Sequence, residues 1–261
     1  MYEFDVIRPT TILEAVEALS DEDAQALGGG QTLIPTLKQR LASPSALVSL
    51  AKVAEMIGIC HDDDGRLCIG AATTHAAVAR DGSYPALSAM AAHIGDPAVR
   101  NRGTIGGSVA NNDPAACYPA GVLGSGATIT TNKRDIAADD FFQGLFETAL
   151  EEGEIITEVK FPIPEAANYQ KFIQPASRFA LVGVFVAKFA DGVRVAVTGA
   201  SEEGVHRWTA AEEALTSEFT PAAIADLTVP SDTLISDAHA SAAYRAHLIK
   251  VMTGRAVKAA G

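Results

Sequence analysis

The spacing of apolar residues near the N-terminus predicts a small β-α-β unit. Apolar residues recur at helical spacing over 11–20, and a short apolar run at 24–27 leads directly into three glycines at 28–30. A short strand, glycines and then the sequence QTLIP are typical of a strand, a tight turn and a helix start. A second apolar run at 46–50 supplies the next strand, so we expect this unit to end near Val53.

Further along the chain, strand and helix patterns surround one long segment without clear periodicity. We expect strands at 67–71, 126–130 and 154–161, helices at 76–80 and 84–94, and a charged hairpin turn at 62–65. The segment 94–119 carries four glycines, three prolines and three asparagines, and it predicts an irregular loop. Loops of this length inside compact domains are usually functional or disordered, and the apolar content here argues against disorder.

The last third of the chain has a different pattern of apolar and polar residues. Two β-rich runs, 181–189 and 193–198, flank an Asp-Gly pair, which is a strong hairpin signal. Three helices are expected after the hairpin, at 208–216, 221–227 and 236–257. Together with two prolines near 162–164, this change in pattern predicts a domain boundary within 162–175, dividing the chain into 1–170 and 171–261.

Composition and charge exclude several classes of protein. Hydrophobic residues make up 48% of the chain and charged residues 20%, which is typical of a globular protein. Twenty Lys and Arg against 32 Asp and Glu give a net charge of −12, which would repel a nucleic acid backbone. Because no apolar run approaches the roughly 20 residues that span a bilayer and no basic leader precedes an apolar core, we expect no transmembrane segment and a cytoplasmic location.

The cysteines and histidines show no metal-ligand spacing. Cys60, Cys68 and Cys117 form no CxxC pair, whereas iron–sulfur clusters and structural zinc sites need about four closely spaced ligands. The six histidines form no HExxH or similar motif. We therefore expect reduced thiols and no metal site on this chain.

Two glycine-rich loops are the strongest candidates for chemistry. The first spans 28–32, and the second, 101–108, adds hydroxyl groups at Thr104 and Ser108. Glycines let a backbone approach a ligand closely, and free amides bind anions such as a diphosphate. Neither loop has the GxGxxG or Walker spacing. Either loop alone could be a purely structural turn, but the two together predict a dinucleotide gripped from two sides.

These loops and their surroundings resemble the FAD-binding medium subunits of the molybdenum hydroxylases, a family that includes carbon monoxide and xanthine dehydrogenases. The resemblance is carried by GGGQTLIPTLK at 28–38 and IGDPAVRNRGTIGGSVANNDPAA at 94–116. Further similarity lies in GAATTHAAVA at 70–79, EIITEVKFP at 154–162 and RWTAAEEAL at 207–215, so it covers essentially the whole chain.

The resemblance implies a fold, a cofactor and partners. It implies an α+β protein with a p-cresol methylhydroxylase-type FAD-binding domain of two α/β subdomains, followed by a small α/β domain with a three-stranded antiparallel sheet and helices. It also implies a small partner subunit with [2Fe–2S] clusters, a large partner subunit with the molybdopterin cofactor, and a dimer of heterotrimers. The flavin would collect electrons from the clusters and pass them to an external acceptor, so no catalytic side chain is expected.

The resemblance also assigns residues to FAD. The first loop and residues 104–108 match the two diphosphate-binding loops, Ile156 matches a position whose backbone contacts the adenine end, and Lys171 matches a lysine near the flavin. The complete set is Gly28, Gly29, Gly30, Gln31, Thr32, Thr104, Ile105, Gly106, Gly107, Ser108, Asp113, Cys117, Ile156 and Lys171. Ile156 could instead be an ordinary core residue and Lys171 a solvated surface residue.

Several positions depart from the family pattern. Cys117 stands where relatives carry a second aspartate, and a thiol is a weaker hydrogen-bond acceptor than a carboxylate. Pro175, Arg178 and Phe179 stand where relatives carry an arginine, an aspartate and an aromatic residue near the flavin ring. We therefore expect changes in FAD affinity and flavin potential, and two alternatives stay open: a stand-alone FAD oxidoreductase and a non-catalytic assembly module that has lost FAD.

Three further residues have open roles. Arg100 and Arg102 could neutralise phosphate or face a partner subunit. Trp208, the only tryptophan, is expected to pack within the C-terminal part of the chain.

Overall fold

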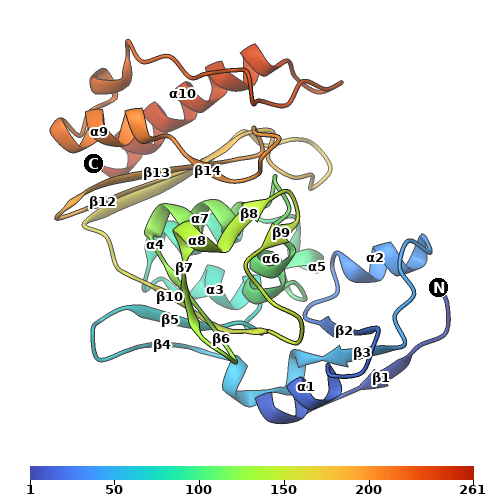
Figure 1. The fold of residues 1–261 in the computed structure, drawn as a ribbon. Coiled ribbons are helices and arrows are strands. Elements are labelled where there is room, and N and C mark those ends of the chain that lie inside the picture. The colour runs from blue at the N-terminus through green and yellow to red at the C-terminus, as the bar shows by residue number, and fades with distance from the viewer.

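Stacked layers of sheet and helix make up the fold of residues 1–261, which we describe from a computed structural model (Figure 1). The N-terminal unit is a parallel sheet with strand order β1-β3-β2. Its elements are β1 (Asp5–Ile7), α1 (Ile12–Ala18), β2 (Ala24–Leu27), α2 (Leu33–Lys38) and β3 (Ala46–Ser49). The predicted β-α-β unit is confirmed.

A five-stranded antiparallel sheet forms the centre, with the order β4-β5-β10-β6-β7. Its strands are β4 (Ile59–His61), β5 (Leu67–Gly70), β6 (Thr128–Thr131), β7 (Asp135–Ala137) and β10 (Ile156–Phe161). The charged turn at 62–65 joins β4 to β5 as expected. The remaining elements of this region are α3 (His75–Asp81), α4 (Pro85–Ala92), α7 (Cys117–Ser125), α8 (Ala138–Phe141), β8 (Phe142–Gly144) and β9 (Glu147–Thr148).

The expectation of an irregular loop over 94–119 is wrong. This segment contains α5 (Pro97–Arg100), α6 (Ile105–Asn111) and the start of α7. Side-chain caps start both short helices: Asp96 accepts hydrogen bonds from two amides of α5, and Thr104 accepts one from the Gly107 amide. Caps of this kind satisfy amides that would otherwise lack partners, which allows a helix to form despite its glycines.

The C-terminal sheet is antiparallel, in the order β11-β12-β13-β14. Its strands are β11 (Ala166–Lys171), β12 (Gly183–Phe189), β13 (Gly192–Thr198) and β14 (His206–Arg207). The predicted hairpin is confirmed, but the sheet has four strands rather than three because the two-residue β14 extends its edge. The helices that follow are α9 (Thr209–Ser217), a 3-10 turn at Pro221–Ile224 and α10 (Ala242–Ala260).

The C-terminal sheet separates two hydrophobic cores. Phe185 and Ala196 belong to the larger core, together with residues of α4, α7 and the central sheet. Val184 and Val195 point the other way, into the core that α9 and α10 cover (Figure 1). Trp208 is buried in this second core, as expected. No helix has the length and apolar character that crossing a membrane requires.

Candidate functional site

The main cavity of the molecule has a volume of about 700 Å³. The N-terminal unit, the segment 103–117, the loop before β10 and the connection between β11 and β12 all contribute to its wall. Every predicted cofactor-binding residue lines this cavity except Ile105, whose side chain is fully buried in the larger core. The fold thus brings together residues that are 143 positions apart in sequence, from Gly28 to Lys171.

The loop after β2 presents a row of unused hydrogen-bond donors. None of the backbone amides of Gly28, Gly29, Gly30, Gln31 and Thr32 donates to an acceptor in the protein. The row ends within the first turn of α2, where the Ile34 amide donates to the Gly30 carbonyl at 3.1 Å. Gly30 has a φ of +73°, which a residue with a side chain adopts only with strain. Consecutive unpaired amides form a concave site for an anionic oxygen.

The two glycine loops pack directly against each other. A methyl group on Gly29 would overlap the Arg102 carbonyl group and the Gly103 backbone, and one on Gly28 would lie 2.8 Å from the Thr104 hydroxyl. The absence of side chains at these positions is therefore a requirement of packing as well as of ligand approach.

The second loop differs from the first in its hydrogen bonding. The Ile105 and Gly106 amides donate to the carbonyls of Thr73 and Ala71, and the Gly107 amide donates to the Thr104 hydroxyl. Among residues 104–108 only the Thr104 amide remains unpaired. The first loop therefore carries most of the unpaired amides at this wall, whereas the backbone of the second loop is largely hydrogen-bonded and adds the Ser108 side chain.

Asp113 and Cys117 lie on the same wall. Asp113 Oδ1 accepts a hydrogen bond from the Ala115 amide at 2.9 Å, yet burial raises the pKa of the Asp113 carboxyl above its usual value. Cys117 is the first residue of α7 and is buried. The wall therefore presents one carboxylate, Asp113, and one thiol, Cys117, at the positions where the family resemblance implies two aspartates.

His75 lines the cavity and was missed from the sequence. Burial lowers the pKa of His75 to about 4, so its ring is neutral at neutral pH. Nδ1 has no hydrogen-bond partner, and the ring packs against Tyr118 with 5.2 Å between centroids. The one sequence feature that could have indicated His75 is its place directly after Thr74, which caps α3. No other ligand-type residue lies nearby in sequence, so this feature alone does not predict a site residue.

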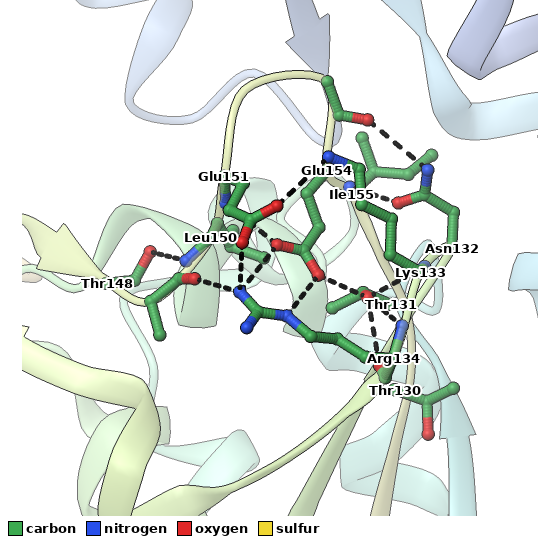
Figure 2. Close-up of polar contacts among 12 residues, drawn as sticks. Thr130, Thr131, Asn132, Lys133, Arg134, Thr148, Leu150, Glu151, Glu154 and Ile155 are labelled. Carbon is green, nitrogen blue, oxygen red and sulfur yellow. Dashed lines mark hydrogen bonds and ion pairs between the residues drawn. The ribbon is translucent and has the colours of Figure 1, made fainter.

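Glu154 is a second missed residue, beside the predicted Ile156. Its side chain is fully buried, and it lies in a network of polar contacts with Arg134 and Thr131 (Figure 2). Burial by itself raises the pKa of Glu154, but hydrogen bonds from Arg134 and Thr131 lower it to about 2. The residue is therefore a permanent carboxylate at the cavity wall.

Basic and aromatic residues gather at another part of the cavity. Lys171 Nζ donates to the His93 carbonyl at 3.0 Å, so the lysine is held in place rather than freely solvated. Arg178 lies 3.3 Å from His239 Nε2, and the Phe179 side chain is 54% exposed. Arg100 donates to the carbonyls of residues 94 and 95 and, like Arg102, does not line the cavity.

Comparison with known proteins identifies the family of the chain. Residues 2–164 match the family described as FAD binding domain in molybdopterin dehydrogenase. The nicotine 6-hydroxylase medium subunit of Paenarthrobacter nicotinovorans is 34% identical over 97% of this chain and 95% of its own length. The carbon monoxide dehydrogenase medium chain of Afipia carboxidovorans is 36% identical over 72% of this chain and 70% of its own length.

Solved structures give the same result for the fold. A chain of quinoline 2-oxidoreductase from Pseudomonas putida 86 superposes with a TM-score of 0.88 at 31% identity, covering 99% of this chain and 96% of that one. The expected α+β fold and the expected family resemblance are confirmed.

Proposed function

The chain belongs to the family of FAD-binding domains of molybdopterin dehydrogenases, and from this premise we propose that it is the electron-transfer subunit of a heteromeric molybdenum hydroxylase. In this role it accepts electrons from [2Fe–2S] clusters of a small partner subunit and passes them to an external acceptor. A large partner subunit holds the molybdopterin cofactor, and the assembly is a cytoplasmic dimer of heterotrimers. That the relatives are named as medium subunits of hydroxylases and dehydrogenases supports this role.

The observation that carries the proposal is the row of unpaired amides at 28–32. Five donors without acceptors are costly unless water or an anionic ligand satisfies them, and a diphosphate offers several acceptor oxygens. The residues present therefore fit FAD. When bound, the flavin exchanges electrons singly or in pairs, and the chain needs only to bind, orient and shield it.

The second loop would complete the diphosphate site. Thr104, whose amide is unpaired, and Ser108 line the same cavity as the first loop, and the close packing of the two loops fixes their separation. Asp113 and Cys117 line the same cavity and would contact the rest of the cofactor. With a thiol instead of a second carboxylate, the wall repels phosphate less and offers a weaker acceptor for hydroxyl groups.

Lys171, Arg178 and Phe179 would flank the flavin ring. Electrons must leave the ring for a partner or acceptor, and the exposed Phe179 marks the part of the cavity that is open to such a contact. Positive charge from Lys171 and Arg178 would favour the reduced, anionic form of a flavin and raise its potential.

The first experiment is an absorbance spectrum of the purified full chain with its co-purifying partners, before and after acid precipitation. The proposal expects released FAD, iron–sulfur absorbance and two companion subunits on a gel. Flavin without partners would favour a stand-alone oxidoreductase, and colourless protein that cannot be reconstituted would favour an assembly module without FAD.

A variant tests the position of the diphosphate. Gly107→Asp adds a carboxylate at a residue that lines the cavity, with its Cβ 3.0 Å from the Thr104 hydroxyl oxygen, and should abolish FAD retention through charge repulsion and steric overlap. Full flavin absorbance in this variant would contradict the assignment of the loop.

A further inference from the structure

The most saturated polar group at the cavity wall is the Glu154 carboxylate. Oε1 accepts hydrogen bonds from Thr131 Oγ1 at 2.7 Å and Arg134 Nε at 3.1 Å. Oε2 accepts from Arg134 Nη2 at 3.1 Å and from the Glu151 amide at 2.9 Å (Figure 2). A carboxylate has about four acceptor positions, and all of them are occupied within the protein. Glu154 therefore has no capacity left to bind a ligand directly.

The network holds one segment of chain against another. The turn between β6 and β7 contributes Asn132, whose amide donates to the Ile155 carbonyl at 3.1 Å and whose Oδ1 accepts from the Ile155 amide at 2.8 Å. Arg134 Nη2 also donates to the Ala149 carbonyl at 2.8 Å. Both polar backbone groups of Ile155 are thereby fixed, and so are both ends of the segment 149–155 (Figure 2).

Only one of the two segments lines the cavity. Leu150, Ile155 and Ile156 contribute to the wall, whereas the turn residues 131–134 do not. The turn 131–134 thus lies outside the cavity wall and supports it, and Glu154 connects the turn to the wall. Because Arg134 neutralises the buried Glu154 carboxylate, this contact adds no uncompensated negative charge beside the cavity that we propose binds an anion.

This wall serves one end of the cavity. The connection from β9 to β10 passes beside the N-terminal unit, while the connection from β11 to β12, which follows Lys171 and carries Phe179, lies on the side of the C-terminal sheet (Figure 1). The wall side chains Leu150, Ile155 and Ile156 are apolar, which suits the faces of a flat ring. The family resemblance implies that Ile156 lies at the adenine end of FAD, and an apolar wall suits that purine ring.

We propose that Glu154 is a positioning residue for the purine end of FAD: through Arg134, Thr131 and the Glu151 amide it fixes the wall that holds the adenine. This inference rests on the proposed FAD function. It assigns to Glu154 the preference for a flavin dinucleotide over a flavin mononucleotide, since only the dinucleotide reaches this wall.

The test compares two buried glutamate–arginine pairs. Glu154→Gln removes the charge at the wall with little change in shape. Glu212→Gln is the matched control, because Glu212 is also buried and also accepts from an arginine, Arg207, at 2.6 Å, but lies in α9 away from the cavity. Each full-length variant is loaded with FAD, its FAD affinity is measured by flavin fluorescence, and FMN is then added until half of the FAD is displaced.

The expected result is a change in selectivity. In Glu154→Gln, FAD binding should weaken about tenfold and the FMN concentration that displaces half of the FAD should fall by about the same factor. Glu212→Gln should change neither value. Unchanged FAD affinity in Glu154→Gln, or an equal weakening of FAD and FMN that leaves the displacement concentration where it was, would overturn the proposal.

Two safeguards separate the possible failures. If Glu154→Gln does not fold, Thr131→Val removes the hydroxyl that donates to Glu154 and accepts from the Lys133 and Arg134 amides, without leaving an unpaired charge. A folded Thr131→Val protein must shift the FMN displacement in the same direction. No change in that variant would also overturn the inference. Wild-type protein that binds no FAD would instead refute the proposed function itself.

Discussion

At Gly29, packing and ligand binding impose the same requirement on one residue. A side chain there would overlap the Arg102 carbonyl group, and the amide of the same residue has no acceptor within the protein. We expect Gly29→Ala to push the two glycine loops apart and to abolish FAD retention, measured as flavin absorbance after gel filtration. Gly254→Ala is the control, because its new methyl group meets only Pro221 at 3.9 Å. This change in α10 should retain FAD and raise the free energy of unfolding by roughly 0.5–1 kcal/mol. Equal FAD content in the two variants would contradict the packing argument.

His75 gives the molecule a specific sensitivity to acid. Its pKa is lowered to about 4 in the folded protein, from an ordinary value of 6.5. Between pH 4 and pH 6.5 the unfolded chain binds a proton at His75 that the folded chain does not. The free energy of unfolding therefore has its full value above pH 6.5 and falls as the pH drops toward 4. The loss attributable to His75 is on the order of 3 kcal/mol.

Urea unfolding of wild type and His75→Gln across pH 4–7 measures this contribution. The difference in unfolding free energy between the two proteins should shrink in the acid range, because the variant has no imidazole to protonate. Parallel curves over the whole range would show that His75 is protonated as easily in the folded protein as in the unfolded one.

The sequence predicts which residues line the cavity where their backbone amides or helix caps form the wall. Gly28 and Thr104 could be placed at the cavity because glycines and caps have local signatures. His75 and Glu154 could not, since their roles depend on burial and on partners such as Arg134, which lies 20 residues from Glu154. The sequence predicts Ile105 as a ligand-binding residue because its neighbours match the second loop. In a helix, however, only one face of the segment 104–108 can point into the cavity.

At the scale of elements, the hairpin and the strands with long apolar runs were predictable, whereas short strands such as β7 (Asp135–Ala137) and the short helices within 94–119 were not. The runs at 181–189 and 193–198 have strong β-periodicity and a clear Asp-Gly turn, and they form β12 and β13. In α6 two glycines and an asparagine weaken the helical pattern, and its formation depends on the Thr104 cap and on packing against Ala71. The sequence predicts that the last helix starts at 236, whereas α10 begins after its capping residue, Ser241.

The contact between β13 and the segment 113–117 should couple changes in the C-terminal sheet to FAD binding. Thr198 is fully buried, and its hydroxyl lies 2.9 Å from the Pro114 carbonyl and 2.8 Å from the Ala116 carbonyl. These carbonyls belong to the segment that holds Asp113 and Cys117 against the cavity. Thr198→Val should therefore lower the free energy of unfolding by about 1–2 kcal/mol and also weaken FAD binding.

Thr253→Val is the matched control for this prediction. Thr253 is equally buried, and its hydroxyl donates to the Ile249 carbonyl at 2.8 Å within α10. The control should lose a similar amount of stability, by urea unfolding, without any change in the FAD dissociation constant. If both variants weaken FAD to the same extent, the effect comes from general loosening and not from the contact between β13 and the segment 113–117.

At the scale of the whole molecule, one sheet belongs to two cores. Phe185 on β12 packs against α7, where a methyl group on Gly124 would lie 2.9 Å from its ring, and its ring contacts Tyr84 of the central region at 6.1 Å between centroids. The adjacent Val184 and Val186 face α9 and α10 instead. Removal of the C-terminal sheet would therefore expose the larger core as well as the smaller one.

A division of the chain near residue 170 thus predicts two structural parts but not two independent folding units. We expect the fragment 1–164 to lack a cooperative thermal transition and to bind a hydrophobic dye, because α4 and α7 would lose the apolar sheet that covers them (Figure 1). In the full chain, Phe185→Ala should lower the midpoint of one shared transition, at a cost of about 3–5 kcal/mol, with FAD release and loss of helix signal occurring together. Two separate transitions, or a cooperatively folded fragment 1–164, would contradict this coupling, because each core would then be stable without the sheet that they share.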